Sequence, residues 1–231
     1  MNIRQLIPLV TLALVALVVA TAGADVPADS RNESYVDPDL DMQRMLSRLE
    51  RETREVYSLR DEIVEASGIR PGEVVADVGA GTGAFMDELV EAVGDDGHLY
   101  AVEISIRFVE YLRERANEAG HDNVTTVFSS YTSATLPTAS VDRIITIDTY
   151  HHFDDYDAML ASMRDALVPG GEMIVVDFDR VEGKSRAWIL SHVRDSKETF
   201  RSEIEAAGFE FVEEVEIDGM VDNFFHRYRR P

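Results

Sequence analysis

Val74 to Gly83 reads VVADVGAGTG, an apolar run that ends in an acid and then breaks into alternating glycines. This pattern predicts a buried parallel strand that leads into a tight turn, with a helix after the last glycine. Because glycine has no Cβ atom, Gly79, Gly81 and Gly83 let the backbone take positive φ angles and let a ligand lie against it. Asp77 can only accept hydrogen bonds, so it needs backbone N–H groups or a ligand ammonium group as its partner. The turn is therefore predicted to be a cofactor site.

Two classes of cofactor fit this turn. The stretch from Gly79 to Ala84 satisfies a loose G-x-G-x-x-G/A dinucleotide fingerprint, and Glu103 lies 20 residues after Gly83, where an acid holds ribose hydroxyls. The longer pattern, an acid two residues before a G-x-G-x-G run, resembles motif I of the class I S-adenosylmethionine (SAM)-dependent methyltransferases. An NAD-linked oxidoreductase stays open as the alternative at this point.

Composition limits the remaining possibilities. The chain has 231 residues, of which 45% are hydrophobic, and this is enough for one sizeable core. The absence of cysteine excludes disulfides, thiolate zinc sites and a cysteine nucleophile. The formal net charge of −22 disfavours nucleic acid as a partner, since so acidic a surface repels phosphate groups.

Residues 1–24 differ in character from the rest of the chain. Arg4 precedes the apolar stretch Leu6 to Ala20, and small residues follow in an A-x-A cleavage pattern. These features predict a cleaved signal peptide or, as the alternative, an uncleaved membrane anchor. Either one would export the body of the protein to the periplasm or hold it at the membrane. A cytoplasmic location stays open because SAM is made in the cytosol.

The chain then passes through a predicted polar linker at 25–38 into the body of the protein,. Apolar residues recur at helical spacing over 39–67 and predict one or two helices. In methyltransferases such a segment often covers the cofactor as a lid. Strands are predicted at 74–78, 98–103, 124–128, 141–147 and 172–178, with helices between them at 84–93, 105–119 and 157–167. This alternation implies parallel βαβ units and a doubly wound α/β sheet.

The end of the chain breaks the alternation. A long helix is predicted over 185–207, followed by strands at 209–217 and 222–229. The link between these strands is too short for a parallel crossover, so the pair is predicted to be antiparallel. A mostly parallel, Rossmann-like sheet that ends in an antiparallel hairpin is similar to the seven-stranded methyltransferase fold. A dehydrogenase domain does not usually end in this way.

Further motifs extend the resemblance to methyltransferases from about Gly68 to Arg230. Tyr100 to Ser105 is similar to the acidic motif of the second strand, Leu136 to Asp148 to the segment entering the fourth, and Leu167 to Phe178 to the fifth. The strings DTYHHF, DFDR and GKSRAWILSHVR are similar to a bacterial subgroup of predicted methyltransferases with N-terminal export signals. The resemblance implies a SAM-dependent methyltransferase domain over 39–231 that acts on a small-molecule acceptor, which the sequence does not identify.

The resemblance also implies roles for single residues. Glu103 would accept hydrogen bonds from both ribose hydroxyls of SAM, and Asp77 would support the turn or accept from the ammonium group. Ser130 and Tyr131 stand where the family commonly has Gly-Asp-Ala in contact with adenine, and Asp148 could contact the amino acid end. The expected cofactor-binding residues are Asp77, Gly79, Ala80, Gly81, Gly83, Glu103, Ile104, Ser130, Tyr131 and Asp148.

His151 and His152 are the catalytic candidates, because they follow the fourth strand at the end where open α/β sheets bind ligands,. Either ring could take a proton from the acceptor, since histidine titrates near neutral pH. Adjacent residues generally point apart, so at most one of the two is expected to act, and structural imidazoles are the alternative. No metal site is predicted, because His-His-Phe-Asp lacks a recognisable ligand spacing.

Methyl transfer is an in-line displacement, so positioning and desolvation can suffice without a strict set of catalytic residues. A non-catalytic SAM-binding protein is therefore the second alternative to a methyltransferase.

Overall fold

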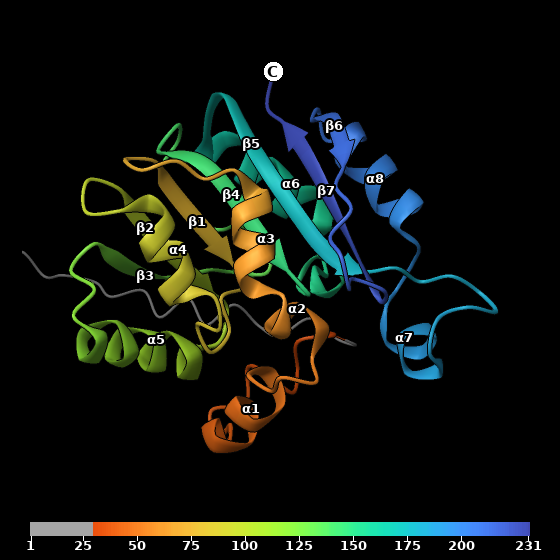
Figure 1. The fold of residues 1–231 in the computed structure, drawn as a ribbon, viewed down its shortest axis with the longest axis horizontal. Helices are drawn as coiled ribbons and strands as arrows, with labels where there is room; N and C mark the ends of the chain where they lie inside the picture. Colours follow the sequence, from red (N-terminus) through yellow and green to blue (C-terminus); the bar gives the residue numbers. More distant parts are fainter. Residues whose placement is uncertain (1–29) are drawn as a thin grey trace, which may run out of the picture.

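The computed structural model describes residues 30–231, and a seven-stranded sheet lies at its centre (Figure 1). The strands are β1 (Val74–Val78), β2 (His98–Glu103), β3 (Val124–Phe128), β4 (Val141–Ile147), β5 (Leu167–Phe178), β6 (Glu210–Glu214) and β7 (Asn223–Arg229). Their order is β3-β2-β1-β4-β5-β7-β6. Neighbours among β1 to β5 pair in parallel, whereas β7 runs antiparallel to both β5 and β6. The predicted fold class is confirmed.

The strand order reverses at β1, which lies between β2 and β4. In open α/β sheets the crevice outside the carboxyl ends of the strands at such a reversal binds ligands. The glycine turn follows β1 directly and therefore opens into this crevice.

Helices cover both faces of the sheet (Figure 1). On one face lie α3 (Arg60–Ser67), α4 (Met86–Val93) and α5 (Ile106–Ala119), and on the other lie α6 (Tyr156–Ala166) and α8 (Lys197–Ala206). Each helix turns an apolar stripe to the sheet; in α5 the buried residues Phe108, Leu112 and Ala116 recur at every fourth position, which is one helical face. Two clusters of buried apolar residues, one on each side of the sheet, pack the helices against the strands whose ends form the crevice.

The segment before β1 contains three helices where one or two were predicted, because α1 (Met42–Leu49) and α2 (Glu55–Ser58) precede α3. Figure 1 shows α1 and α7 (Ala187–His192) at the end of the sheet to which β1 points. Glu50 and Arg54 take non-helical backbone angles between α1 and α2. The role of this segment as a lid stays a prediction.

The described part of the predicted linker contacts the body of the protein. The Ser30 hydroxyl donates to Asp154 at 2.6 Å, and the Asn32 amide donates to the His152 carbonyl at 2.9 Å. The predicted signal peptide or anchor lies outside the described residues. Within 30–231, every helix is too short or too polar to cross a membrane.

Two predicted element bounds are wrong. The long helix predicted over 185–207 is two helices, α7 and α8, because Ser196 caps a new helix by accepting from the Thr199 N–H,. The fifth strand was predicted to begin at Glu172, yet β5 begins at Leu167 and runs through Pro169 to Gly171. A register shift against β4 accommodates this extension.

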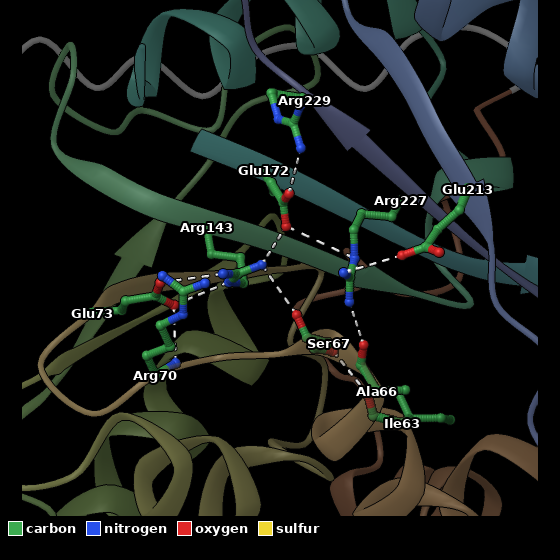
Figure 2. Close-up of polar contacts among 10 residues, drawn as sticks. All are labelled: Ile63, Ala66, Ser67, Arg70, Glu73, Arg143, Glu172, Glu213, Arg227 and Arg229. Carbon is green, nitrogen blue, oxygen red and sulfur yellow. Dashed lines mark hydrogen bonds and ion pairs between the residues drawn. The ribbon is translucent and has the colours of Figure 1, made fainter. Parts of the chain in front are cut away.

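Arg143 is a charged residue inside an otherwise apolar strand, and Figure 2 shows how it is accommodated. Its side chain is buried and donates to Glu73 at 3.0 Å, to Glu172 at 2.7 Å and to the Ser67 carbonyl at 3.1 Å. Arg227 lies beside the same Glu172 and bonds the Ala66 carbonyl. This ion-pair network joins β4, β5 and β7 near the amino ends of the parallel strands, far from the glycine turn.

Candidate active site

The three glycines of the turn have different environments. Gly79, Gly81 and Gly83 all have positive φ angles, of 87°, 55° and 76°. A Cβ atom on Gly79 would lie 2.2 Å from Thr149 Cγ2, and one on Gly83 would lie 2.9 Å from Leu112 Cδ2. A Cβ atom on Gly81 would meet only ordinary contacts, the nearest being Leu49 Cδ1 at 3.7 Å. Gly79 and Gly83 are therefore required by packing, whereas Gly81 leaves room for a ligand.

A cleft lies over this turn, with about 980 Å³ of empty space when the part open to solvent is included. All the predicted cofactor-binding residues except Gly83 line it. His152 also lines the cleft, whereas His151 does not. The structure thus brings together residues from the ends of β1, β2 and β4 and from the loop after β3.

Asp77 is a carboxyl group without a protein partner. It is 5% exposed, lines the cleft and makes no hydrogen bond or ion pair to the described residues. Burial, together with the nearby Glu103 carboxylate, raises the pKa of Asp77 to about 7, because both disfavour the charged form. A cationic ligand group in the cleft would stabilise the ionised carboxylate.

Glu103, unlike Asp77, accepts several hydrogen bonds from the backbone. One of its oxygens accepts from the Gly81 N–H at 2.9 Å, and the other accepts from Ile104 and Ser105 N–H at 2.7 and 3.0 Å. Burial raises the pKa of Glu103, and these backbone bonds oppose the rise. A carboxylate has about four acceptor positions, so three bonds leave roughly one for a ligand. Glu103 therefore ties the turn to β2 and keeps one acceptor position toward the cleft.

Asp148 follows β4 with a φ of 49°, an uncommon value for a residue with a side chain. Arg54 donates to its carboxylate at 2.9 and 3.2 Å, and the Asn223 amide donates at 2.6 Å. Burial raises the pKa of Asp148 and Arg54 opposes the rise. Both oxygens of Asp148 therefore accept hydrogen bonds from the protein. Arg54, which also lines the cleft, is the charged group that can contact a ligand at this place.

The loop after β3 forms the wall where adenine contacts were expected. The Ser130 N–H donates to the Ser133 carbonyl at 2.9 Å, and its hydroxyl accepts from the Thr132 N–H at 3.3 Å. The Tyr131 hydroxyl is buried without a hydrogen-bond partner among the residues that the structure describes. Burial raises the pKa of Tyr131.

The expectation that the adjacent histidines point apart is wrong. Their ring centroids are 4.2 Å apart, because the chain makes a short 3-10 helix, η1 (Tyr150–His152), after β4. His151 is 1% exposed and its Nδ1 lies 2.7 Å from Asp177. Burial, with the neighbouring His151 and His192 rings, lowers the pKa of His152 to about 2. A ring with that pKa is neutral and accepts a proton poorly at neutral pH.

Sequence reasoning missed Arg54 and His192. Arg54 lies in a segment whose charges look like those of any solvated helix, and its partner Asp148 is 94 residues away. His192 is 40 residues from His152 in sequence, yet the two ring centroids are 5.1 Å apart. No local spacing links either pair, so only the fold brings them together.

The strand order and the cleft at the carboxyl ends of the strands match the fold of the class I SAM-dependent methyltransferases. Residues 75–171 match the family model described as a methyltransferase domain. The structure is similar to that of a SAM-dependent methyltransferase from Aquifex aeolicus, with a TM-score of 0.72, 22% identity, and coverage of 83% of this chain and 99% of that one. The cyclase SpnF has the same fold, with a TM-score of 0.65, 17% identity, and coverage of 76% of this chain and 80% of that one.

Curated relatives match over shorter stretches. The protein-L-isoaspartate O-methyltransferase of Ignicoccus hospitalis is 36% identical over 83 residues, which are 36% of this chain and 39% of that protein. The ubiquinone/menaquinone biosynthesis C-methyltransferase UbiE of Teredinibacter turnerae is 29% identical over 118 residues, which are 51% of this chain and 47% of that protein. The chain therefore spans less than half the length of either relative. An NAD-linked oxidoreductase is not favoured by these comparisons.

Proposed function

We propose that the protein transfers the methyl group of SAM to a small, largely apolar acceptor molecule. The observation that carries this proposal is the Asp77 carboxyl group, which is buried in the cleft wall without a protein partner. A buried acid in this state is costly unless a ligand supplies the missing charge or donor. The ammonium group of SAM has the charge that Asp77 lacks.

The remaining contacts to SAM follow from the donors and acceptors left free. Arg54 uses three of its five N–H donors on Asp148 and the Leu49 carbonyl, so two are available for the carboxylate of SAM. Glu103 offers its remaining acceptor position to one ribose hydroxyl. Ile104, Ser130 and Tyr131 line the wall on the adenine side.

An apolar acceptor is supported by the far wall of the cleft. Tyr35, Phe108 and Phe153 are among the residues that line the cleft, and aromatic side chains favour flat apolar ligands. The UbiE relative, by its name, acts in quinone biosynthesis, and such a ring would fit this wall. We therefore propose phenols and hydroquinones as the first acceptors to examine.

The transfer itself needs the methyl carbon held in line between the sulfur and the acceptor atom. The acceptor atom would form a bond to the methyl carbon while the carbon–sulfur bond breaks, which would leave S-adenosylhomocysteine and release the acceptor's proton to solvent. The cleft would supply positioning and exclusion of water. His152 is an unsuitable base because its pKa is about 2.

The test is release of S-adenosylhomocysteine from SAM with phenol, hydroquinone, thiol and amine acceptors. Phenols or hydroquinones are expected to turn over, and Asp77→Ala is expected to abolish the release. Glu91→Gln is the matched control, because Glu91 is an exposed acid on α4. SAM binding without release for any acceptor would instead favour a non-catalytic SAM-binding protein.

A further inference from the structure

Three histidines from two distant segments meet beside the cleft. His151 and His152 lie on η1, and His192 is the last residue of α7. The ring centroids of His192 are 5.0 and 5.1 Å from those of His151 and His152. One nitrogen of each ring lies within 4.8 Å of the other two.

Asp177 determines which nitrogen of His151 carries the proton. Its buried carboxylate lies 2.7 Å from His151 Nδ1 and also accepts the His151 and Phe178 backbone N–H groups. A carboxylate only accepts, so Nδ1 carries the hydrogen, and it is Nε2 that is left to bind a metal ion through the lone pair of the neutral ring. That Nε2 atom is buried without a hydrogen-bond partner in the described part of the chain. This carboxylate–histidine arrangement is the one that supports metal-bound histidines in metalloproteins.

His152 has the same feature. Its Nδ1 atom is buried and makes no hydrogen bond to residues 30–231. Packing alone does not explain why His151 Nε2 and His152 Nδ1 lack partners, because the polar atoms of buried side chains are usually satisfied by hydrogen bonds. One nitrogen of each of the three rings lies close to a nitrogen of the other two, so a single ion among the rings would contact all three histidines.

We propose that His151, His152 and His192 bind a transition-metal ion, Zn²⁺ by preference, with Asp177 orienting His151. Imidazole nitrogens suit zinc, and three histidines with an open fourth position are typical of catalytic zinc sites. Zinc–nitrogen bonds of about 2.1 Å put tetrahedral ligands roughly 3.4 Å apart, so the rings must close by up to about 1.4 Å. His192 can make this movement because it ends a helix of six residues and its ring is partly exposed. The sequence-based expectation of no metal site rested on local spacing, which cannot include His192.

The position of the ion gives it a task in methyl transfer, and this part rests on the proposed function. His152 lines the cleft, so the open fourth position would be within reach of an acceptor. A phenol oxygen bound to Zn²⁺ loses its proton to solvent more readily. That oxygen would then form the bond to the methyl carbon of SAM as the carbon–sulfur bond breaks.

The test is a titration of the metal-depleted full chain, carrying no polyhistidine tag, with Co²⁺ and then with competing Zn²⁺. We expect one equivalent of Co²⁺ to give the visible absorption of a tetrahedral site and Zn²⁺ to remove it. His192→Gln is expected to lower the apparent affinity by at least about 10- to 100-fold, the loss known for weaker, indirect disturbances of such sites. His98→Gln is the matched control, because His98 lies at the opposite end of the sheet at the start of β2.

X-ray absorption of the Zn²⁺-loaded wild-type chain gives a second measurement that needs no variant. Three nitrogen neighbours at about 2.0–2.1 Å are expected. Failure of the wild-type chain to bind Co²⁺ and Zn²⁺, or equal binding by His192→Gln and wild type, would overturn the metal site. SAM titrated into the same samples keeps the two proposals separate, since cofactor binding does not need the metal.

Discussion

At the scale of single residues, Glu103 and Asp77 are two buried acids of the cleft that differ in what surrounds them. Glu103 accepts three backbone N–H groups, whereas Asp77 accepts none from the described residues. The first acid is satisfied by the fold and holds the turn in place. The second is left for a ligand, and SAM bound as proposed would relieve a cost that folding leaves in the wall.

This cost predicts a dependence of stability on pH. The pKa of Asp77 is 3.8 in the unfolded chain and about 7 in the folded one. Below pH 4 both states are protonated; between about pH 4 and 7 only the unfolded state ionises, so stability falls as pH rises. The free energy of unfolding of wild type relative to Asp77→Asn is therefore expected to decrease across this window and to level off above it. Urea denaturation of both proteins from pH 4 to 8 measures the difference; a constant difference would contradict the burial of this acid.

The turn yields a steric prediction. Gly81→Val is expected to leave the protein folded and to abolish SAM binding, because the new side chain would occupy the cofactor position. Gly120→Ala controls for backbone strain, since Gly120 has a φ of 75° with no atom within 4 Å of its Cβ position. Thermal melting and SAM titration are measured on both. Unchanged SAM affinity in folded Gly81→Val would place the cofactor elsewhere.

Most of the cofactor-binding residues predicted from the sequence line the cleft, but the sequence did not predict how the two adjacent histidines lie. The cofactor-binding candidates lie within or next to single motifs at strand ends, and this is why almost all of them line the cleft. The histidine pair was misjudged because the expectation that adjacent residues point apart assumes an extended chain. The short 3-10 helix after β4 turns both rings to one side.

At the scale of elements, the break between α7 and α8 has the largest consequence. The apolar spacing over 185–207 continues across the break, and therefore predicted one helix. Asp195 and Ser196 end that continuity, because Asp195 accepts from the Thr199 hydroxyl and Ser196 accepts from the Thr199 N–H. The Ser196 cap therefore fixes where α8 begins, and α7 ends four residues earlier at His192.

The cap predicts a modest loss of stability. Ser196→Ala removes the acceptor of the Thr199 N–H in the first turn of α8 and is expected to lower the free energy of unfolding by about 1 kcal/mol. Urea denaturation measures this change. Ser202→Ala is the control, since Ser202 lies inside α8, is exposed and donates to a carbonyl of its own helix. Equal stability of Ser196→Ala and wild type would mean that another group caps the helix.

At the scale of the whole molecule, the two ends of the parallel strands have different tasks. The carboxyl ends carry the cleft, whereas the amino ends carry the ion-pair network around Arg143 (Figure 2). The order of strands was predictable because it follows from βαβ connections and one short hairpin link. The ion-pair network could not be predicted from the sequence, because Arg143, Glu73 and Glu172 become neighbours only when the strands pair.

This separation predicts that stability and cofactor binding can be changed independently. Arg143→Leu leaves Glu73 and Glu172 without their main partner and is expected to lower the free energy of unfolding by about 3–5 kcal/mol. SAM affinity measured below the melting temperature is expected to stay unchanged. A parallel loss of SAM affinity would mean that the network shapes the cleft through the strands.

Calorimetric titration of the full chain with SAM, S-adenosylhomocysteine and NAD tests the central claim most directly, with Glu103→Ala measured alongside. Selective binding of the two adenosyl-sulfur compounds, weakened in Glu103→Ala, is the predicted result. Binding of NAD as tight as that of SAM, or no binding of SAM, would contradict the assignment of the cleft.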